Sequence, residues 1–361
     1  MVHQGMQANR RRTAEPPTQP PQARCRPCCP QGPPGTGRAG GPSADGRTMD
    51  PLRVLAEEIG FFTRAQARDA GYADRDVTRA VRQGLWRRIR RGYYTFGDLW
   101  RIADPVDQHR IRSRAVIDSL GDRVALSHVS GVIEHGVDVW GLDLSRVHVT
   151  RLDGGPGRIE GDVVHHEGFC GAGEVVERDG RRVLPPERCV VEAGSRTDNE
   201  RALVMMDSLL HRGLVEHGEL FAQFELMARW PFVQHLHLAV RMADGRAESV
   251  GESRGRYLFW SHGLPVPQLQ YAVRDSKGAV VATSDWGWPE HGLLGEFDGQ
   301  LKYGRLLRPG QDAGSVVFAE KQREDLAREV SGMGMVRLVW SDYDRPALTV
   351  ARVRRALRLS G

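Results

Sequence analysis

The chain has 361 residues, 40% of them hydrophobic and 27% charged, a composition typical of globular proteins. That length allows two or three domains, and no stretch approaches the roughly 18 apolar residues of a membrane-spanning helix. The net charge of +5 resides in residues 1–48, where seven arginines face only Glu15 and Asp45. The other residues balance in charge, so global charge alone does not indicate a nucleic-acid partner.

Residues 1–48 are predicted to be a disordered Pro/Arg-rich tail. They hold nine of the twenty prolines and show no apolar periodicity, so they cannot bury a core. The stretch "CRPCC" gives one CxxC without a second ligand pair, which favours incidental thiols over a zinc site. We expect translation to start at Met49 and, because no signal peptide is visible, a cytoplasmic location.

Residues 49–103 are predicted to form a winged helix-turn-helix domain. Apolar positions favour helices over 50–60, 61–71 and 73–84, and Thr63 is placed to cap the second. The following "LWRRIRRGYYTF" alternates around Gly92, as two strands joined by a tight turn would. Three helices followed by a hairpin are the element order of a winged helix.

Positive charge gathers where such a domain contacts DNA. Three arginines spaced i, i+4 and i+7 share one face of the third helix, and four more lie on the hairpin. The third helix would enter the major groove while hairpin arginines bind phosphates. The alternative is a solvated basic face. The predicted DNA-binding residues are Arg75, Arg79, Arg82, Arg87, Arg88, Arg90 and Arg91.

Residues 104–240 are predicted to be a middle α/β region. We expect helices over 107–121, 127–136 and 197–213, with Ser127 as a helix cap, a short strand that leads from residue 123 into the second helix, and strands at 146–151 and 162–168. Eight of the thirteen histidines lie in residues 104–230, without a metal-binding spacing such as HExxH, so each is interpreted as structural. They are His109, His128, His135, His148, His165, His166, His211 and His217.

Residues 246–361 are predicted to fold as a mixed sheet flanked by helices. The first helix places Tyr257, Leu258 and Trp260 inward and carries Glu252. Asp285 is expected to end the second strand. Glu296 and Asp298 alternate by two residues, so they face the same side of the third strand. Convergent carboxylates can hold Mg²⁺, which can activate water for phosphodiester hydrolysis.

This acidic pattern resembles the restriction-endonuclease-like fold of the PD-(D/E)XK superfamily, and more narrowly the very-short-patch-repair endonucleases. The resemblance rests on Glu252, "GLPVPQLQYAV", Asp285, "WPE" and the "EFDG" that begins at Glu296. It implies an Mg²⁺-dependent DNA endonuclease with Glu252, Asp285 and Glu296 as metal ligands, and Asp298 and Lys302 as further catalytic residues. The chain departs from the superfamily at Asp298, which stands where a lysine is usual; Lys302 and Lys321 are the nearest substitutes.

The front of the chain resembles a second family. "GFFTRAQARDAGYADRDVTRAVRQGLWRRIRRGYYTF" is similar to the winged-helix domain of AbiEi-type antitoxins of type IV toxin–antitoxin systems, and residues up to about 220 are similar to the region that follows it. This resemblance implies promoter binding, repression of the operon and a nucleotidyltransferase-like toxin as partner. The alternatives are a non-catalytic regulator with a degenerate nuclease fold, or an interaction protein that binds no DNA.

Overall fold

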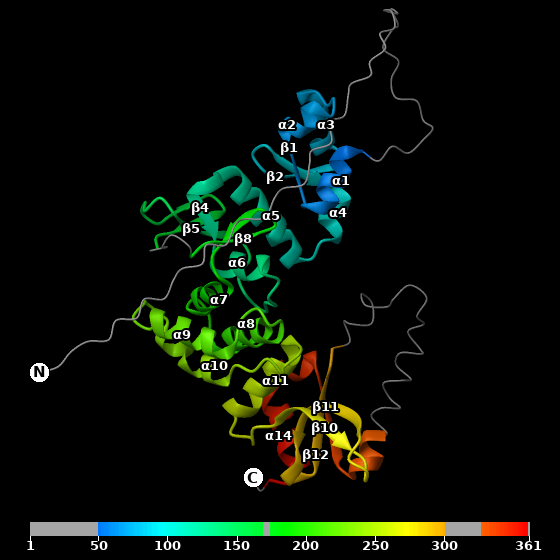
Figure 1. The fold of residues 1–361 in the computed structure, drawn as a ribbon. Coiled ribbons are helices and arrows are strands. Elements are labelled where there is room, and N and C mark those ends of the chain that lie inside the picture. Colours follow the sequence, from blue (N-terminus) through cyan, green and yellow to red (C-terminus); the bar gives the residue numbers. More distant parts are fainter. Residues whose placement is uncertain (1–49, 169–173, 300–325, 360–361) are drawn as a thin grey trace, which may run out of the picture. The chain divides into compact units, whose positions relative to one another are not determined.

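The computed structural model of the chain describes residues 50–168, 174–299 and 326–359, which form a mixed α/β structure (Figure 1). The described residues contain three sheets, and each of the three predicted regions after the tail contains one of them. Within these residues no helix is long and apolar enough to cross a membrane. The tail, Cys170, Lys302 and Lys321 lie outside the described residues.

The first region is a three-stranded antiparallel sheet with helices. The predicted helices and hairpin are present, and β1 and α4 join them without having been predicted. The elements are α1 (Pro51–Glu58), β1 (Phe62–Thr63), α2 (Arg64–Asp69), α3 (Asp74–Arg82), β2 (Trp86–Arg90), β3 (Tyr93–Phe96) and α4 (Gly97–Ile102). Thr63 caps α2 as predicted, because its hydroxyl accepts the amide of Gln66 at 3.2 Å.

A small aromatic core holds this region together. Phe62 of β1 meets Trp86 of β2 edge-on with ring centroids 4.7 Å apart, and both are buried with Val77 of α3. Gly92 makes the turn between β2 and β3 at a φ of +85°, in the region that glycine adopts without strain. The burial of Val77 directs the opposite face of α3 toward solvent.

The middle region contains a six-stranded mixed sheet with the order β6-β7-β5-β4-β9-β8. β5 runs parallel to β7, β4 runs parallel to β9, and the other neighbours are antiparallel. The strands are β4 (Val124–Leu126), β5 (Val147–Arg151), β6 (Arg158–Glu160), β7 (Val163–His166), β8 (Val176–Arg178) and β9 (Arg181–Val183). Of these, β5 and β7 match the strands predicted at 146–151 and 162–168, and β4 matches the short strand predicted to lead into the following helix.

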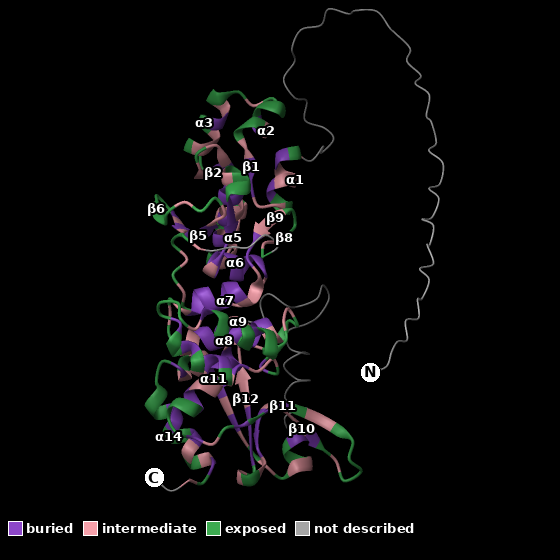
Figure 2. Cartoon of the chain, turned by 60° about the vertical axis from the view of Figure 1, so that its left-hand side comes forward, coloured by how far each residue is buried: buried purple, intermediate pink, exposed green. Residues whose placement is uncertain are grey.

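Helices supply most of the core of this region. They are α5 (Pro105–Leu120), α6 (His128–Glu134), α7 (Pro186–Gly194), α8 (Asn199–His211), α9 (His217–Met227) and α10 (His237–Met242). Figure 2 shows α6, α7 and α8 almost continuously in the colour of buried residues. Met205 and Met206 of α8 are fully buried, as the helical periodicity predicts.

The C-terminal region carries a sheet with the order β10-β11-β12-β13, in which only β12 and β13 are parallel. The elements are α11 (Val250–Ser261), β10 (Gln268–Arg274), β11 (Val280–Trp288), β12 (Leu293–Asp298), β13 (Gly334–Val339) and α14 (Pro346–Ala356). Two glycines let α11 lie directly on the sheet. A Cβ at Gly251 would come 2.0 Å from Phe297, and one at Gly255 would come 2.3 Å from Trp286.

Three details differ from the predictions. Ser127 does not cap α6, because its side chain makes no capping bond and its Oγ lies 3.1 Å from the His128 ring. Asp285 lies inside β11, which continues to Trp288. Trp260 is 41% exposed while Phe259 is fully buried, because Phe259 shares the sheet-facing side of α11 with the two glycines.

Candidate nucleic-acid interface and acidic positions

The arginines of α3 lie on its solvent face. Arg75, Arg79 and Arg82 are exposed, opposite the buried Val77. Asp76 is the nearest acid to this row, at 3.7 Å from the Arg79 guanidinium, so the ion pair is long and solvent-screened. The row therefore keeps its positive charge available to a ligand.

The arginines of β2 extend this charge onto the hairpin. Arg87, Arg88 and Arg91 are exposed, and Arg90 is half-buried. The Arg87 guanidinium lies 5.9 Å from the centre of the Trp100 ring, a contact that orients it without neutralising it. Arg90 has a buried Nη1 without a hydrogen-bond partner among the described residues.

A second acid of α3, Asp74, is directed toward α2 and not toward this row. Asp74, at the start of α3, forms ion pairs with Arg64 and Arg68 of α2 at 2.8 and 2.9 Å. Hydrogen bonds from Arg68 and Arg64 lower the pKa of the Asp74 carboxyl to about 2, so it is ionised at neutral pH. This neutralises two arginines of α2, and the seven predicted DNA-binding arginines are not among them.

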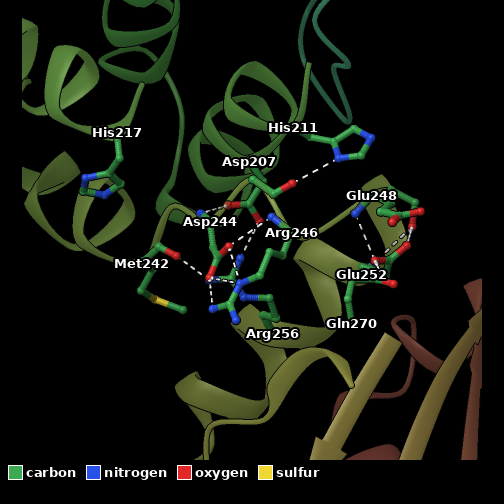
Figure 3. A network of polar contacts seen from close by, with 12 residues as sticks. Asp207, His211, His217, Met242, Asp244, Arg246, Glu248, Glu252, Arg256 and Gln270 are labelled. Carbon is green, nitrogen blue, oxygen red and sulfur yellow. Dashed lines mark hydrogen bonds and ion pairs between the residues drawn. The ribbon is translucent and has the colours of Figure 1, made fainter. Parts of the chain in front are cut away.

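The first predicted metal ligand, Glu252, is buried near the start of α11 and already holds hydrogen bonds from the protein (Figure 3). Its Oε1 accepts the Ser249 hydroxyl at 2.6 Å. Its Oε2 accepts the Glu248 amide at 2.9 Å and the Gln270 side chain at 3.2 Å. These contacts fix the carboxylate at the N-terminus of α11 and tie the helix to β10.

The remaining acids meet across neighbouring strands. The Asp285 carboxylate on β11 accepts the amide of Phe297 on β12 at 2.8 Å. Glu296 and Asp298 face the same side of β12, as predicted, since both reach the guanidinium of Arg337 on β13, at 3.6 and 3.7 Å. The sheet therefore brings these acids to one end and places a fixed arginine beside two of them.

This arrangement is not a compact set of magnesium ligands. Within the described residues, Glu252, Asp285 and Glu296 do not form a group whose ligand atoms all lie within 4.8 Å of one another. Protein hydrogen bonds already hold Glu252 and Asp285, and the positive charge of Arg337 beside Glu296 opposes a cation there. As they lie, these residues do not fit Mg²⁺.

One cluster was not predicted as a site. Among the described residues, His128, His148 and His166 form the one group of three whose ligand atoms all lie within 4.8 Å of one another. They come from α6, β5 and β7, and their spacing in the sequence matches no metal-binding motif. Predicting this cluster would have required knowing that β5 and β7 pair in parallel, and the sequence does not show which strands are neighbours.

Comparison with known proteins bears on the arginine-rich region. Residues 49–97 match the family model described as "Transcriptional regulator, AbiEi antitoxin". This AbiEi segment contains all seven predicted DNA-binding arginines. The match is confined to this part of the chain.

Two similar proteins and one solved structure come from Mycobacterium tuberculosis. The chain is 33% identical over 120 residues to the uncharacterized proteins MT2308 and Rv2248 of two Mycobacterium tuberculosis strains, a match covering 33% of this chain. It spans 44% of the length of each relative. A crystal structure of the RV2827C protein from Mycobacterium tuberculosis aligns with a TM-score of 0.33 and 14% identity, over 63% of this chain and 85% of that chain.

Proposed function

We propose that the protein is a DNA-binding transcriptional regulator of the AbiEi antitoxin type, with the AbiEi segment folded as a winged helix. The observation that carries the proposal is the coincidence of that family match with a row of exposed arginines on α3 and β2. The order of helices and the antiparallel hairpin also support it.

The arginines of α3 and those of the hairpin would contact different parts of the DNA. Arg75, Arg79 and Arg82 project from one face of α3, which is the helix that would enter the major groove. Arg87 and Arg88 on the hairpin would contact phosphates, which position the domain but do not read sequence. Phosphate contacts release bound cations from DNA, so the affinity would depend strongly on salt concentration.

Charge reversal tests this function directly. A mobility-shift titration on the promoter fragment of the protein's own gene compares the wild type with the double variant Arg79→Glu/Arg88→Glu. We expect the variant to lose at least about thirtyfold in affinity, since each of the two lost charged contacts costs about 1–3 kcal/mol.

The matched control is Arg355→Glu, which reverses an exposed arginine on α14. It alters net charge by half as much and should bind as the wild type does. Equal binding by the wild type and the double variant would show that α3 and β2 do not contact DNA.

We also propose that a nucleotidyltransferase-like toxin is the partner and that the bound promoter belongs to their shared operon. This extends the antitoxin assignment and rests on the AbiEi segment alone. If a neighbouring gene of that class encodes the toxin, its expression alone should arrest growth, and co-expression of this chain should relieve the arrest. No relief by the wild type would remove the antitoxin role while leaving DNA binding to be judged by the titration.

For the C-terminal region the alternatives are phosphodiester hydrolysis and a non-catalytic role, and the observation in favour of hydrolysis is the meeting of Asp285, Glu296 and Asp298 at one end of a mixed sheet. The hydrogen bonds to Glu252 and the Arg337 contacts favour the non-catalytic alternative, in which the nuclease-like region is a binding platform.

Nicking of supercoiled DNA with Mg²⁺ or Mn²⁺ decides between them. Asp285→Asn removes the charge and keeps an acceptor for the Phe297 amide, and Asp344→Asn alters an exposed acid as control. Nicking by the wild type and the control but not by Asp285→Asn would establish a nuclease. We expect no nicking by any of the three.

A further inference from the structure

The histidine cluster of the middle region differs from the other buried histidines nearby. His109 is buried with both ring nitrogens in hydrogen bonds, to the Leu144 carbonyl at 3.0 Å and the Ser130 hydroxyl at 2.9 Å. In the cluster, the rings bond to one another instead: Nδ1 of His148 and Nε2 of His166 share a hydrogen bond at 2.9 Å. His128 stacks face-to-face on His166 with ring centroids 3.7 Å apart. One ring nitrogen from each of the three residues lies within 4.8 Å of the others.

We propose that His128, His148 and His166 bind one divalent transition-metal ion of the zinc class, with a fourth coordination position facing the adjoining cavity. Zinc takes imidazole nitrogens at about 2.0–2.1 Å, which places two ligand atoms of a tetrahedral ion about 3.3 Å apart. The 2.9 Å between His148 and His166 needs only a small widening to reach that separation. The His128 ring, which stacks on His166, has to turn so that its nitrogen also points at the ion.

The cavity supplies access and room. It has a volume of about 230 Å³, and His128 and His148 line it together with Asp143, Arg146 and Arg196. Three histidines with an open side correspond to the arrangement in which zinc keeps one position for water or another ligand. Asp143 on the cavity wall offsets part of the positive charge of the two arginines, while Glu192 behind His128 is paired with Arg188 at 3.0 Å.

Glu192 also orients the first ligand. Its carboxylate is buried and lies 3.2 Å from Nδ1 of His128. A proton on Nδ1 that is shared with this carboxylate leaves the lone pair of His128 on Nε2, the atom a metal would take. The His128 backbone lies in the left-handed region at a φ of +48°, an unusual conformation for a residue with a side chain.

Burial lowers the pKa of His148 to about 3 and that of His166 to about 4, and it lowers the pKa of His128 well below its usual value. These shifts follow from the packing of the rings, so the proposal stands on the geometry of the cluster and its cavity. The competing interpretation is a packed group of neutral histidines without a ligand.

Equilibrium dialysis against Zn²⁺ or Co²⁺ tests the site. The full chain carries Cys25, Cys28 and Cys29, whose thiolates would compete for the metal, so all three are first replaced by serine. We expect this parent chain to bind one ion. His148→Gln and His166→Gln should each weaken binding about a hundredfold or more, since they remove direct ligands.

His165→Gln is the matched control, because His165 is also buried on β7 but points to the opposite face, toward Glu160 at 3.8 Å. It should keep one ion. Absence of binding by the parent chain, or equal binding by His166→Gln and the parent, would overturn the proposal.

If the glutamine variants fail to fold, X-ray absorption of the zinc-loaded parent chain decides instead. Three imidazole ligands around the ion would support the site, and fewer than three would refute it. Neither outcome depends on whether the protein binds DNA.

Discussion

Asp207 illustrates how this chain accommodates a buried charge. It is fully buried on α8, where the Arg256 guanidinium and the Asp244 amide each donate to it at 2.8 Å (Figure 3). Burial raises the pKa of the carboxyl to about 6, and the positive charge of Arg256 is the largest effect opposing that rise. Arg256 therefore keeps Asp207 ionised, and the pair joins α8 to α11.

Replacing Arg256 with methionine should destabilise the protein strongly, because it leaves the buried Asp207 carboxylate without its partner. We expect a loss of about 3–5 kcal/mol in the free energy of unfolding, measured by urea denaturation at pH 7. The control is Arg246→Ala, which removes an exposed partner of Asp244 and should cost less than about 1 kcal/mol. Similar losses in both variants would contradict this account of Asp207.

At the scale of the element, the contact between α11 and its sheet depends on two glycines, because a residue without a side chain lets the sheet approach the helix backbone closely. Gly251, Gly255 and Phe259 lie on one face of the helix, spaced by four residues. The glycines admit the rings of Phe297 and Trp286 against the helix backbone. This close approach also brings Glu252 to Gln270 of β10.

Adding a methyl group should test that contact. Gly255→Ala places a Cβ 2.3 Å from Trp286, a fully buried ring, so we expect a loss of about 1–3 kcal/mol from overpacking. Gly218→Ala on α9 is the control, because no atom lies within 4 Å of its Cβ position. That change should be neutral or stabilise by up to about 1 kcal/mol, as alanine favours helices. Urea midpoints of the two variants in the same direction would argue against the packing.

Elements with a clear apolar period could be predicted, and short ones could not. The buried face of α8 and the exposed arginines of α3 follow from spacing alone. Strands of two or three residues, such as β1, β6, β8 and β9, are too short to show an alternation. The histidine cluster needs the neighbouring positions of β5 and β7, and strand order is a property of the whole sheet. Trp260 was misplaced because the glycines, not the large residues, decide which face of α11 meets the sheet.

For the whole molecule, the DNA-binding proposal rests on where positive charge is located and not on the net charge. Outside the tail the acids and bases balance in number, yet α3 and β2 expose a local excess of arginine. The family match covers the same part of the chain. The C-terminal region carries acids that are held by hydrogen bonds and by Arg337. The middle region carries a histidine cluster beside a cavity. The DNA-binding proposal therefore concerns one region, and the other proposals stand apart from it.

The measurement that tests DNA binding most directly is the salt dependence of affinity for a promoter fragment. The slope of log affinity against log salt changes by about 0.9 for each phosphate contact on B-DNA. We predict a steep dependence for the wild type, made shallower by about one in Arg88→Ala and unchanged in the α14 control Arg355→Ala. Equal slopes in all three proteins, or a wild-type affinity that does not respond to salt, would contradict the account.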